Sequence, residues 1–231
     1  MKQYFQVSHS AFYSVVTALP LLIGYEIMLA STSNPYWHVR NAVDIWMRHV
    51  LQSFDVSTRQ ATFVMIGVLF AAIPFIHKKE TPLRFKYAGW MILEAIIYSL
   101  CLNLIIQSVL KPVFLTKMIP LSNSIQSIAL SLGAGLFEEF FFRVILLNVL
   151  YFGLLFLLKK PLLSGIIAIL LASFLFSLSH YFGNMADSFN LYSFLFRWFA
   201  GLLFTLLYFL RGFGITAYTH AFYDIRILLL A

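Results

Sequence analysis

The sequence predicts an all-α protein, a polytopic bundle of transmembrane helices. The chain has 231 residues, of which 61% are hydrophobic and only 11% are charged, whereas a typical soluble domain carries about 25% charged residues. Apolar runs long enough to cross about 30 Å of hydrocarbon recur from one end of the chain to the other. No run alternates as the strands of a membrane barrel do. Helices, which satisfy their own backbone hydrogen bonds, are therefore expected in the bilayer.

Seven runs are predicted to span the membrane, because each approaches or exceeds the roughly 20 apolar residues that a helical crossing needs. The fourth run is much longer than one crossing, so it must tilt, kink or begin at the interface, and an eighth, partial helix could lie within it. The runs are residues 11–30, 61–77, 87–110, 125–158, 162–181, 191–210 and 213–230.

The segment between the first two spans, residues 31–60, is more polar and is predicted to hold an interfacial amphipathic helix. Its apolar residues partly follow helical spacing against charged residues such as Arg40 and Asp44. Trp37 and Trp46 suit the headgroup region. We interpret the helix as a structural anchor, with a flexible gate or a substrate-binding element as the alternatives.

Charge and composition limit the partners and the organisation of the chain. Sixteen Lys and Arg against nine Asp and Glu give a net charge of +7. Most of the cations lie in short loops between apolar runs, so the lipid bilayer with its anionic headgroups is the expected partner, and nucleic acid is not. Cys101 is the single cysteine, which excludes an intrachain disulfide. No repeat or linker divides residues 1–231, which we interpret as one membrane domain. The sequence indicates no oligomeric state.

Ionisable residues inside the apolar runs mark the candidate site, because charge at bilayer depth is costly and is usually functional. Glu26 and Glu94 stand alone in their runs and are interpreted as structural. The others gather in the second half of the chain: Glu138, Glu139, Arg143, His180, Arg197, His220, Asp224 and Arg226.

Spacing separates the roles of the two adjacent glutamates. Glu139 and Arg143 are four residues apart, so they share a helix face and can form an ion pair. Glu138 is turned about 100° away from Glu139, which leaves it without that partner and makes it a candidate general base. A buried pair that only fastens helices together is the alternative.

His220 and Asp224 are also four residues apart, so the carboxylate can accept a hydrogen bond from a ring nitrogen and fix the tautomer. His180 lies near the end of the fifth run. Together with Glu138, these residues could activate water without a metal, or they could bind a divalent metal, since all are good zinc ligands. The lack of an HExxH run argues against zinc.

Three motifs in consecutive apolar runs carry a family pattern: Glu138-Glu139-x-x-x-Arg143, Phe176-x-x-x-His180 and His220-x-x-x-Asp224. In this order they resemble the CPBP intramembrane proteases, the CAAX-processing and bacteriocin-processing enzymes also called the Abi family. The resemblance covers residues 124–224, which would form the catalytic core, and leaves residues 1–123 as accessory transmembrane helices.

The resemblance implies a multi-pass endopeptidase that hydrolyses a peptide bond of a membrane-associated protein or peptide, and we expect it in a prokaryotic cell (inner) membrane. Glu138 and His180 would activate a water, while His220 and Asp224 would stabilise the oxyanion. Glu139 and Arg143 would support these residues. No cofactor is favoured. Prenyl-processing members carry Asn where Asp224 stands, so we expect Asp224 to orient His220 or, when protonated, to donate directly.

Three other functions compete with this one. A zinc-dependent version of the protease would use Glu138, His180, His220 and Asp224 as ligands. A non-catalytic membrane scaffold or immunity protein of the same fold would keep the charges as contacts between helices. A proton-coupled carrier would use them as a relay, but the two corresponding halves typical of carriers are absent from the sequence.

Overall fold

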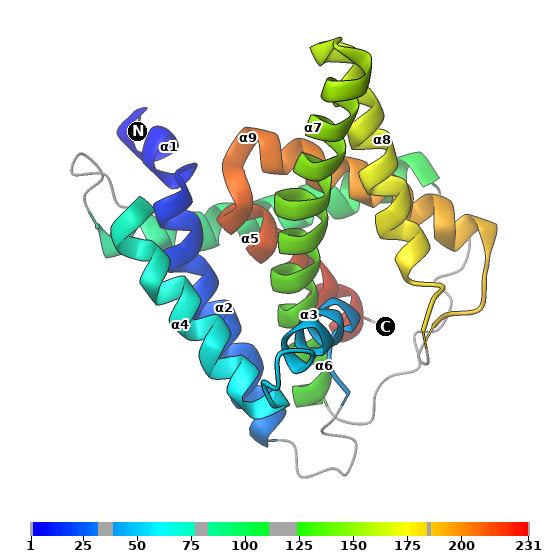
Figure 1. The fold of residues 1–231 in the computed structure, drawn as a ribbon. Helices are drawn as coiled ribbons and strands as arrows, with labels where there is room; N and C mark the ends of the chain where they lie inside the picture. The colour runs from blue at the N-terminus through cyan, green and yellow to red at the C-terminus, as the bar shows by residue number, and fades with distance from the viewer. Residues whose placement is uncertain (1, 32–38, 77–82, 111–123, 184–185, 231) are drawn as a thin grey trace.

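The computed structural model describes residues 2–31, 39–76, 83–110, 124–183 and 186–230. Within these ranges the chain is helical and contains no strand, which confirms the all-α prediction. Six helices of the described residues are long and apolar enough to cross a membrane, so the protein is an integral, multi-pass membrane protein. The elements of Figure 1 are α1 (Lys2–Ser8), α2 (Ala11–Ser31), α3 (Ala42–Gln52), α4 (Thr58–Ile76), α5 (Phe85–Leu110), α6 (Ser124–Gly133), the π-helical segments η2 (Ala134–Glu138) and η3 (Phe140–Leu146), α7 (Leu147–Leu158), α8 (Pro161–Ser179) and α9 (Leu191–Leu230).

The long fourth run is one continuous apolar helix from Ile125 to Leu158, formed by α6, η2, η3 and α7. The run, all of whose residues the structure describes, therefore holds no separate eighth helix. The two π-helical segments lie in its middle. π-helical turns are rare and occur often at functional sites. This run therefore provides both the central helix of the bundle and a local irregularity at the two glutamates.

The last two predicted spans, 191–210 and 213–230, both lie in α9, which consists of two helical segments separated by a kink. The joint is Gly212, whose backbone has φ 79° and ψ 174° inside an otherwise helical segment. Residues with a side chain rarely adopt a positive φ, whereas glycine does so at little cost. A Cβ at this position would also lie 3.1 Å from the carbonyl oxygen of His9. Glycine thus allows the chain to turn back along the bundle.

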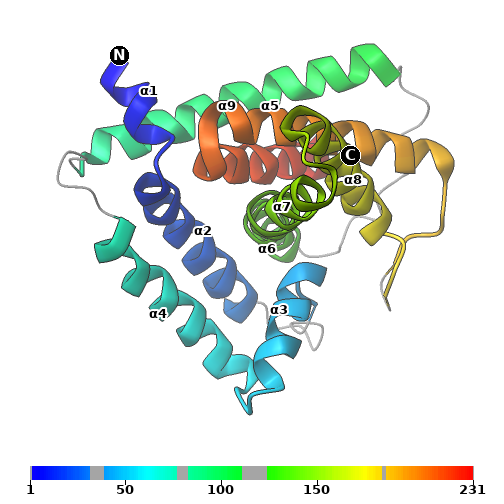
Figure 2. The ribbon, with the colours of Figure 1, turned by 45° about the horizontal axis from the view of Figure 1, so that its top comes forward.

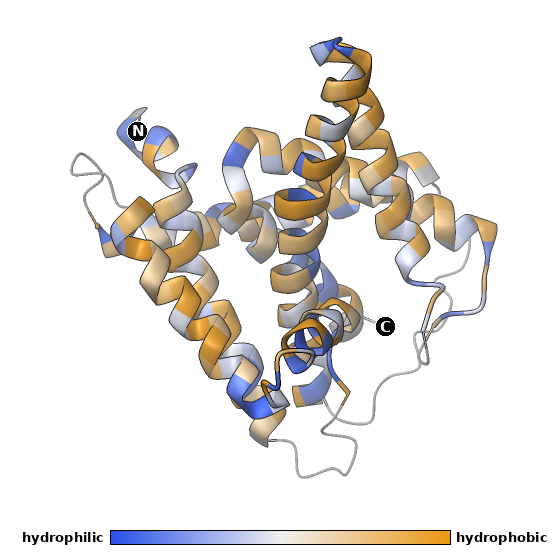
Figure 3. Cartoon of the chain, in the orientation of Figure 1, coloured by the Kyte–Doolittle hydropathy of each residue, from blue (hydrophilic) through white to orange (hydrophobic). Residues whose placement is uncertain are grey.

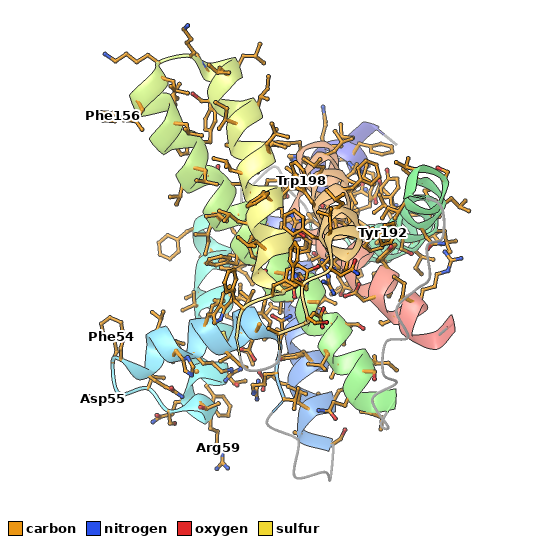
Figure 4. The ribbon with its side chains drawn as sticks, turned by 90° about the vertical axis from the view of Figure 1, so that its right-hand side faces the viewer. Phe54, Asp55, Arg59, Phe156, Tyr192 and Trp198 are labelled. Carbon is orange, nitrogen blue, oxygen red and sulfur yellow. The ribbon has the colours of Figure 1, made fainter. Side chains whose placement is uncertain are left out.

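The helices surround the central run. α2 packs against α4 and α6, α5 runs along α9, and α7 pairs with α8 in a hairpin that projects beyond the other helices (Figures 1 and 2). Figure 3 shows hydrophobic residues along most of α4, α7 and α8, as expected of helices that face lipid. Phe156 extends outward near the free end of this hairpin (Figure 4) and is 81% exposed.

The helix expected between the first two spans is α3. Its charged residues face the protein, whereas in a surface anchor they would face the headgroups. Asp44 and Arg48 are buried, while Val50 is 62% exposed and Phe54, at the outer turn before α4 (Figure 4), is 75% exposed. Polar residues that point inward and apolar residues that point outward suit a helix in contact with lipid. Trp37 lies outside the described residues.

Four ionic side chains fasten α3 to α2. Arg40 lies 2.9 Å from the Oε1 atom of Glu26 and 3.0 Å from the Oδ2 atom of Asp44. Arg48 forms ion pairs with the same two carboxylates. Each buried charge is therefore paired, which a low-dielectric interior requires. The structural interpretation of Glu26 agrees with these contacts.

Glu94 has a similar role between α5 and α9. It forms an ion pair with Arg211 and accepts hydrogen bonds from the hydroxyls of Tyr4 and Tyr98. Arg211 also donates to the hydroxyl of Ser8. These contacts tie the N-terminal helix, α5 and α9 together, in agreement with the structural interpretation of Glu94.

Candidate active site

The two glutamates are presented by η2 and the residue that follows it, where the central run packs tightly on the second half of α9. A Cβ at Gly135 would lie 2.3 Å from the carbonyl oxygen of Ala217 and 2.8 Å from the Cβ of Ala221. Only glycine permits the two backbones to approach so closely. Glu138 and Glu139 are both buried, and the close approach brings Glu139 beside the histidine of α9.

Glu139 lies close to His220. Its Oε1 atom lies 2.7 Å from the Nδ1 atom of His220, and the Nε2 atom of the same ring lies 3.5 Å from Asp224. The sequence predicts that Asp224 orients the ring, but Glu139 is the nearer carboxylate, and 3.5 Å is long for a hydrogen bond. The contact was not predicted because it joins residues 81 positions apart.

Arg143 completes the charge arrangement around Glu139. Its Nη1 atom lies 3.0 Å from the Oε1 atom of Glu139, as the spacing of four residues predicts. Its Nη2 atom donates to the carbonyl of Gly201 at 3.3 Å, and its guanidinium stacks over the ring of Phe176. Arg143 is only 1% exposed, so it neutralises the buried carboxylate from within the bundle.

Aromatic rings enclose His220. Phe204 stacks on it, with the ring centroids 4.5 Å apart and the planes at 22°. Phe176 meets it edge to face, with the centroids 6.0 Å apart. These contacts limit rotation of the imidazole and exclude bulk water from one side of it.

His180 follows directly after the last residue of α8. Its Nδ1 atom lies 3.0 Å from the carbonyl oxygen of Phe176. A carbonyl can only accept, so Nδ1 carries the proton and Nε2 of the neutral ring is left as an acceptor. Burial lowers the pKa of His180 below its usual value, and the charge of Glu138 opposes this shift. The ring is thus kept neutral near pH 7.

The four candidate residues come from three separate parts of the chain. Glu138 lies on η2, His180 at the end of α8, and His220 with Asp224 on α9. The charge of Glu138 acts on both histidines and on Asp224, so these groups share one electrostatic environment. The charge of Arg197 also acts on His180 and Asp224, and Arg197 is itself paired with Asp187.

Asn41 also contacts this site, although sequence analysis did not single it out. Its Nδ2 atom donates to the Oε1 atom of Glu138 at 2.7 Å. The residue is the N-cap of α3, and its Oδ1 atom accepts from the backbone N–H of Val43. Asn at the start of a helix usually indicates a cap and nothing more, so only the folded chain reveals the contact with Glu138.

No group of three or more His, Cys, Asp or Glu side chains within the described ranges is arranged as a metal site. The contacts of the donor atoms explain why. Glu138 accepts from Asn41, and the Nδ1 atom of His220 is engaged by Glu139. The zinc alternative would require these side chains to rearrange.

Comparison with known families gives a match that covers slightly less than half of the chain. Residues 120–226 match the family described as type II CAAX prenyl endopeptidase Rce1-like. No curated protein and no solved structure matches. The matched region contains all three motifs and the six residues that the sequence analysis assigns to the site. Residues 120–226 are therefore similar to the Rce1-like type II CAAX prenyl endopeptidases.

Proposed function

We propose that this protein hydrolyses a peptide bond of a membrane-associated protein or peptide in the inner membrane of a prokaryotic cell, and that Glu138, His180, His220 and Asp224 carry the reaction. The proposal is supported by the positions of Glu138 on η2, His180 at the end of α8 and His220 with Asp224 on α9, where Glu139, next to Glu138, contacts His220 at 2.7 Å. Ionisable groups gathered at bilayer depth are usually functional.

Glu138 and His180 would activate the attacking water. In this step the water transfers a proton to Glu138 or to the Nε2 atom of His180 as its oxygen bonds to the carbonyl carbon of the substrate. The Nδ1 atom of His180 is engaged by the carbonyl of Phe176, which leaves Nε2 as the nitrogen that can accept a proton. A positioned base of this kind contributes about 10²- to 10⁴-fold to the rate.

His220 would stabilise the negative charge that develops on the carbonyl oxygen. Its Nδ1 atom is occupied by Glu139, so Nε2 is the nitrogen left for an oxyanion, with Asp224 beside it. The tetrahedral intermediate then collapses: the bond between carbon and nitrogen breaks, and the proton taken from water passes to the leaving amine. The products are a carboxylic acid and an amine, which at neutral pH ionise to a carboxylate and an ammonium group, and the enzyme gains or loses no proton over the cycle.

Glu139 and Arg143 would hold His220 without touching the substrate. Both are fully buried and form an ion pair with each other, and Arg143 also contacts Gly201 in the first half of α9. Their role would be to fix the distance between the central run and α9 while keeping the net charge of the pair near zero.

A comparison of protein termini tests the proposal without a known substrate. Membranes from host cells that carry the wild-type chain or Glu138→Gln at matched expression are digested, and the termini are identified by mass spectrometry. Termini that occur only with the wild type are expected. Identical sets of termini from two folded proteins would favour the scaffold function instead.

The description of the family supplies a first substrate for a purified assay. It names a CAAX prenyl endopeptidase, so a farnesylated peptide that ends in the C-a-a-X pattern is the first to test. The same assay tests the zinc-dependent alternative. Cleavage is expected to survive treatment with a chelator, and a loss that zinc restores would favour the metal-dependent mechanism.

A further inference from the structure

The side chain of Asn41 joins the N-terminal helices to the candidate active site. It lies 97 residues before Glu138 in the chain and outside the region that matches the family, yet its amide donates to Glu138 at 2.7 Å. Glu138 is only 8% exposed. A hydrogen bond to a buried carboxylate is stronger than one between neutral groups.

The second hydrogen bond of Asn41 fixes the orientation of its amide. The Oδ1 atom accepts from the backbone N–H of Val43 at 3.0 Å. If the amide were turned over, its oxygen would face the carboxylate of Glu138 and its NH₂ group would face the N–H of Val43. Both contacts would then be repulsive. Asn41 therefore presents a donor to Glu138 in one orientation only.

The backbone that carries Asn41 is also held in place. Its N–H donates to the hydroxyl of Tyr25 at 3.2 Å, and that hydroxyl donates to Asp44 at 2.8 Å. Asp44 is fully buried and belongs to the ionic cluster between α2 and α3. A Cβ at Gly133 would lie 2.6 Å from the ring of Tyr25 and 3.2 Å from the Cβ of Asn41. The start of α3 is thus packed directly against the central run.

We propose that Asn41 is a positioning residue that holds the carboxylate of Glu138 for catalysis. With Oε1 bound by Asn41, the Oε2 atom of Glu138 is left to take the proton of the attacking water. The ionic cluster of α2 and α3 serves as the rigid support of this donor. The inference rests on the proposed role of Glu138 as a base, and it gives the N-terminal helices a part in the reaction.

Two substitutions separate positioning from helix capping. Asn41→Ser and Asn41→Asp both keep a side chain that caps a helix well. Serine is too short to reach Glu138, and ionised aspartate cannot donate to it. Asn190→Ser is the matched control, because Asn190 caps α9 through backbone N–H groups of Tyr192 and Ser193 and is exposed.

The first readout is cleavage of the farnesylated peptide by the purified full-length protein in lipid nanodiscs. Both Asn41 variants are expected to lose kcat, by up to about 100-fold for a misplacement near 1 Å. Asn41→Ser is expected to keep KM and the melting temperature close to those of the wild type, whereas Asn41→Asp, which sets a second carboxylate beside buried Glu138, is expected to lower the melting temperature. Asn190→Ser is expected to match the wild type in all three quantities.

The second readout needs no substrate. The carboxylate stretching band of Glu138 is assigned in the infrared difference spectrum by its loss in Glu138→Gln. Removal of a strong donor is expected to shift this band in both Asn41 variants and not in Asn190→Ser.

The outcomes distinguish the inference from the proposed function. An unchanged band in Asn41→Ser, or unchanged cleavage by Asn41→Ser when Glu138→Gln is inactive, would overturn the positioning role and leave the proposed function intact. Equal cleavage by the wild type and Glu138→Gln would overturn the proposed function and the positioning role together, even if the band shifts.

Discussion

Gly135 controls how closely the central run approaches α9, and Gly135→Ala tests whether that approach matters. The new Cβ would lie 2.3 Å from the carbonyl oxygen of Ala217, where ordinary contacts begin at 3.4 Å. The obstacle is backbone, so the helices must separate by about 1 Å at this point. Such a movement would stretch the contact between Glu139 and His220 from 2.7 Å beyond hydrogen-bonding distance.

The substitution is expected to lower the stability of the fold and the rate of cleavage together. Overpacking of this kind costs about 1–3 kcal/mol, against a gain of about 1 kcal/mol from the helix propensity of alanine. A misplacement near 1 Å can reduce the rate by about 100-fold. Unfolding in detergent followed by fluorescence measures the first effect, and cleavage of the farnesylated peptide measures the second.

Gly153→Ala is the matched control, since Gly153 lies on the same continuous helix and a Cβ there meets nothing within 4 Å. It is expected to leave cleavage unchanged and to keep or slightly raise stability. If Gly135→Ala were as active and as stable as Gly153→Ala, the argument that close backbone packing positions the site would be refuted.

Three further substitutions or conditions test other parts of the site. Arg143→Met should destabilise the fold by about 3–5 kcal/mol, because it leaves the fully buried Glu139 without its cation; denaturant unfolding checks this, and a variant as stable as the wild type would contradict it. Asp224→Asn should retain most of the cleavage rate, because Glu139 is nearer to His220 than Asp224 is; a severe loss would indicate that Asp224 orients His220 or binds a metal. Burial holds the pKa of His180 below its ordinary value, so its ring stays neutral as the pH falls through about 6.5; the pH profile of kcat/KM should decline only below that pH, and a decline centred above it would speak against His180 as a proton acceptor.

The transmembrane helices could be predicted from sequence because their length is set by the bilayer and not by the rest of the fold. The predicted run 11–30 is α2 (Ala11–Ser31), and the predicted run 162–181 is α8 (Pro161–Ser179). The break between the last two predicted runs is Gly212, where the backbone leaves the helical conformation. The π-helical form of η2 and η3 could not be predicted, because the apolar pattern of the run indicates a helix but not the type of helical turn.

The candidate residues could also be predicted, because ionisable side chains in apolar runs stand out against their surroundings. The contacts that these residues make with one another could not be predicted. Spacing within a helix predicts the pair of Glu139 and Arg143, but the contact of Glu139 with His220 joins two helices. Helical periodicity describes a single element and carries no information on the distance between elements.

α3 shows the same limit in another way. The spacing of its charged residues predicts the polar face of a surface helix. In the structure Asp44 and Arg48 are buried, because their ionic partners lie on α2 and on α3 itself. Asn41 carries no chemical signature beyond that of a helix cap. Both roles depend on contacts between segments far apart in the chain.

The most direct test of the central claim is a purified assay of Glu138→Gln in lipid nanodiscs. The substrate is a peptide that spans a cleavage site identified by the comparison of termini, and Glu94→Gln serves as the control for loss of a carboxylate inside the membrane. Folded Glu138→Gln is expected to lose at least about 10²-fold in rate, while folded Glu94→Gln keeps the rate of the wild type. Equal rates for wild type and Glu138→Gln would contradict the assignment of Glu138 as the base of an intramembrane endopeptidase.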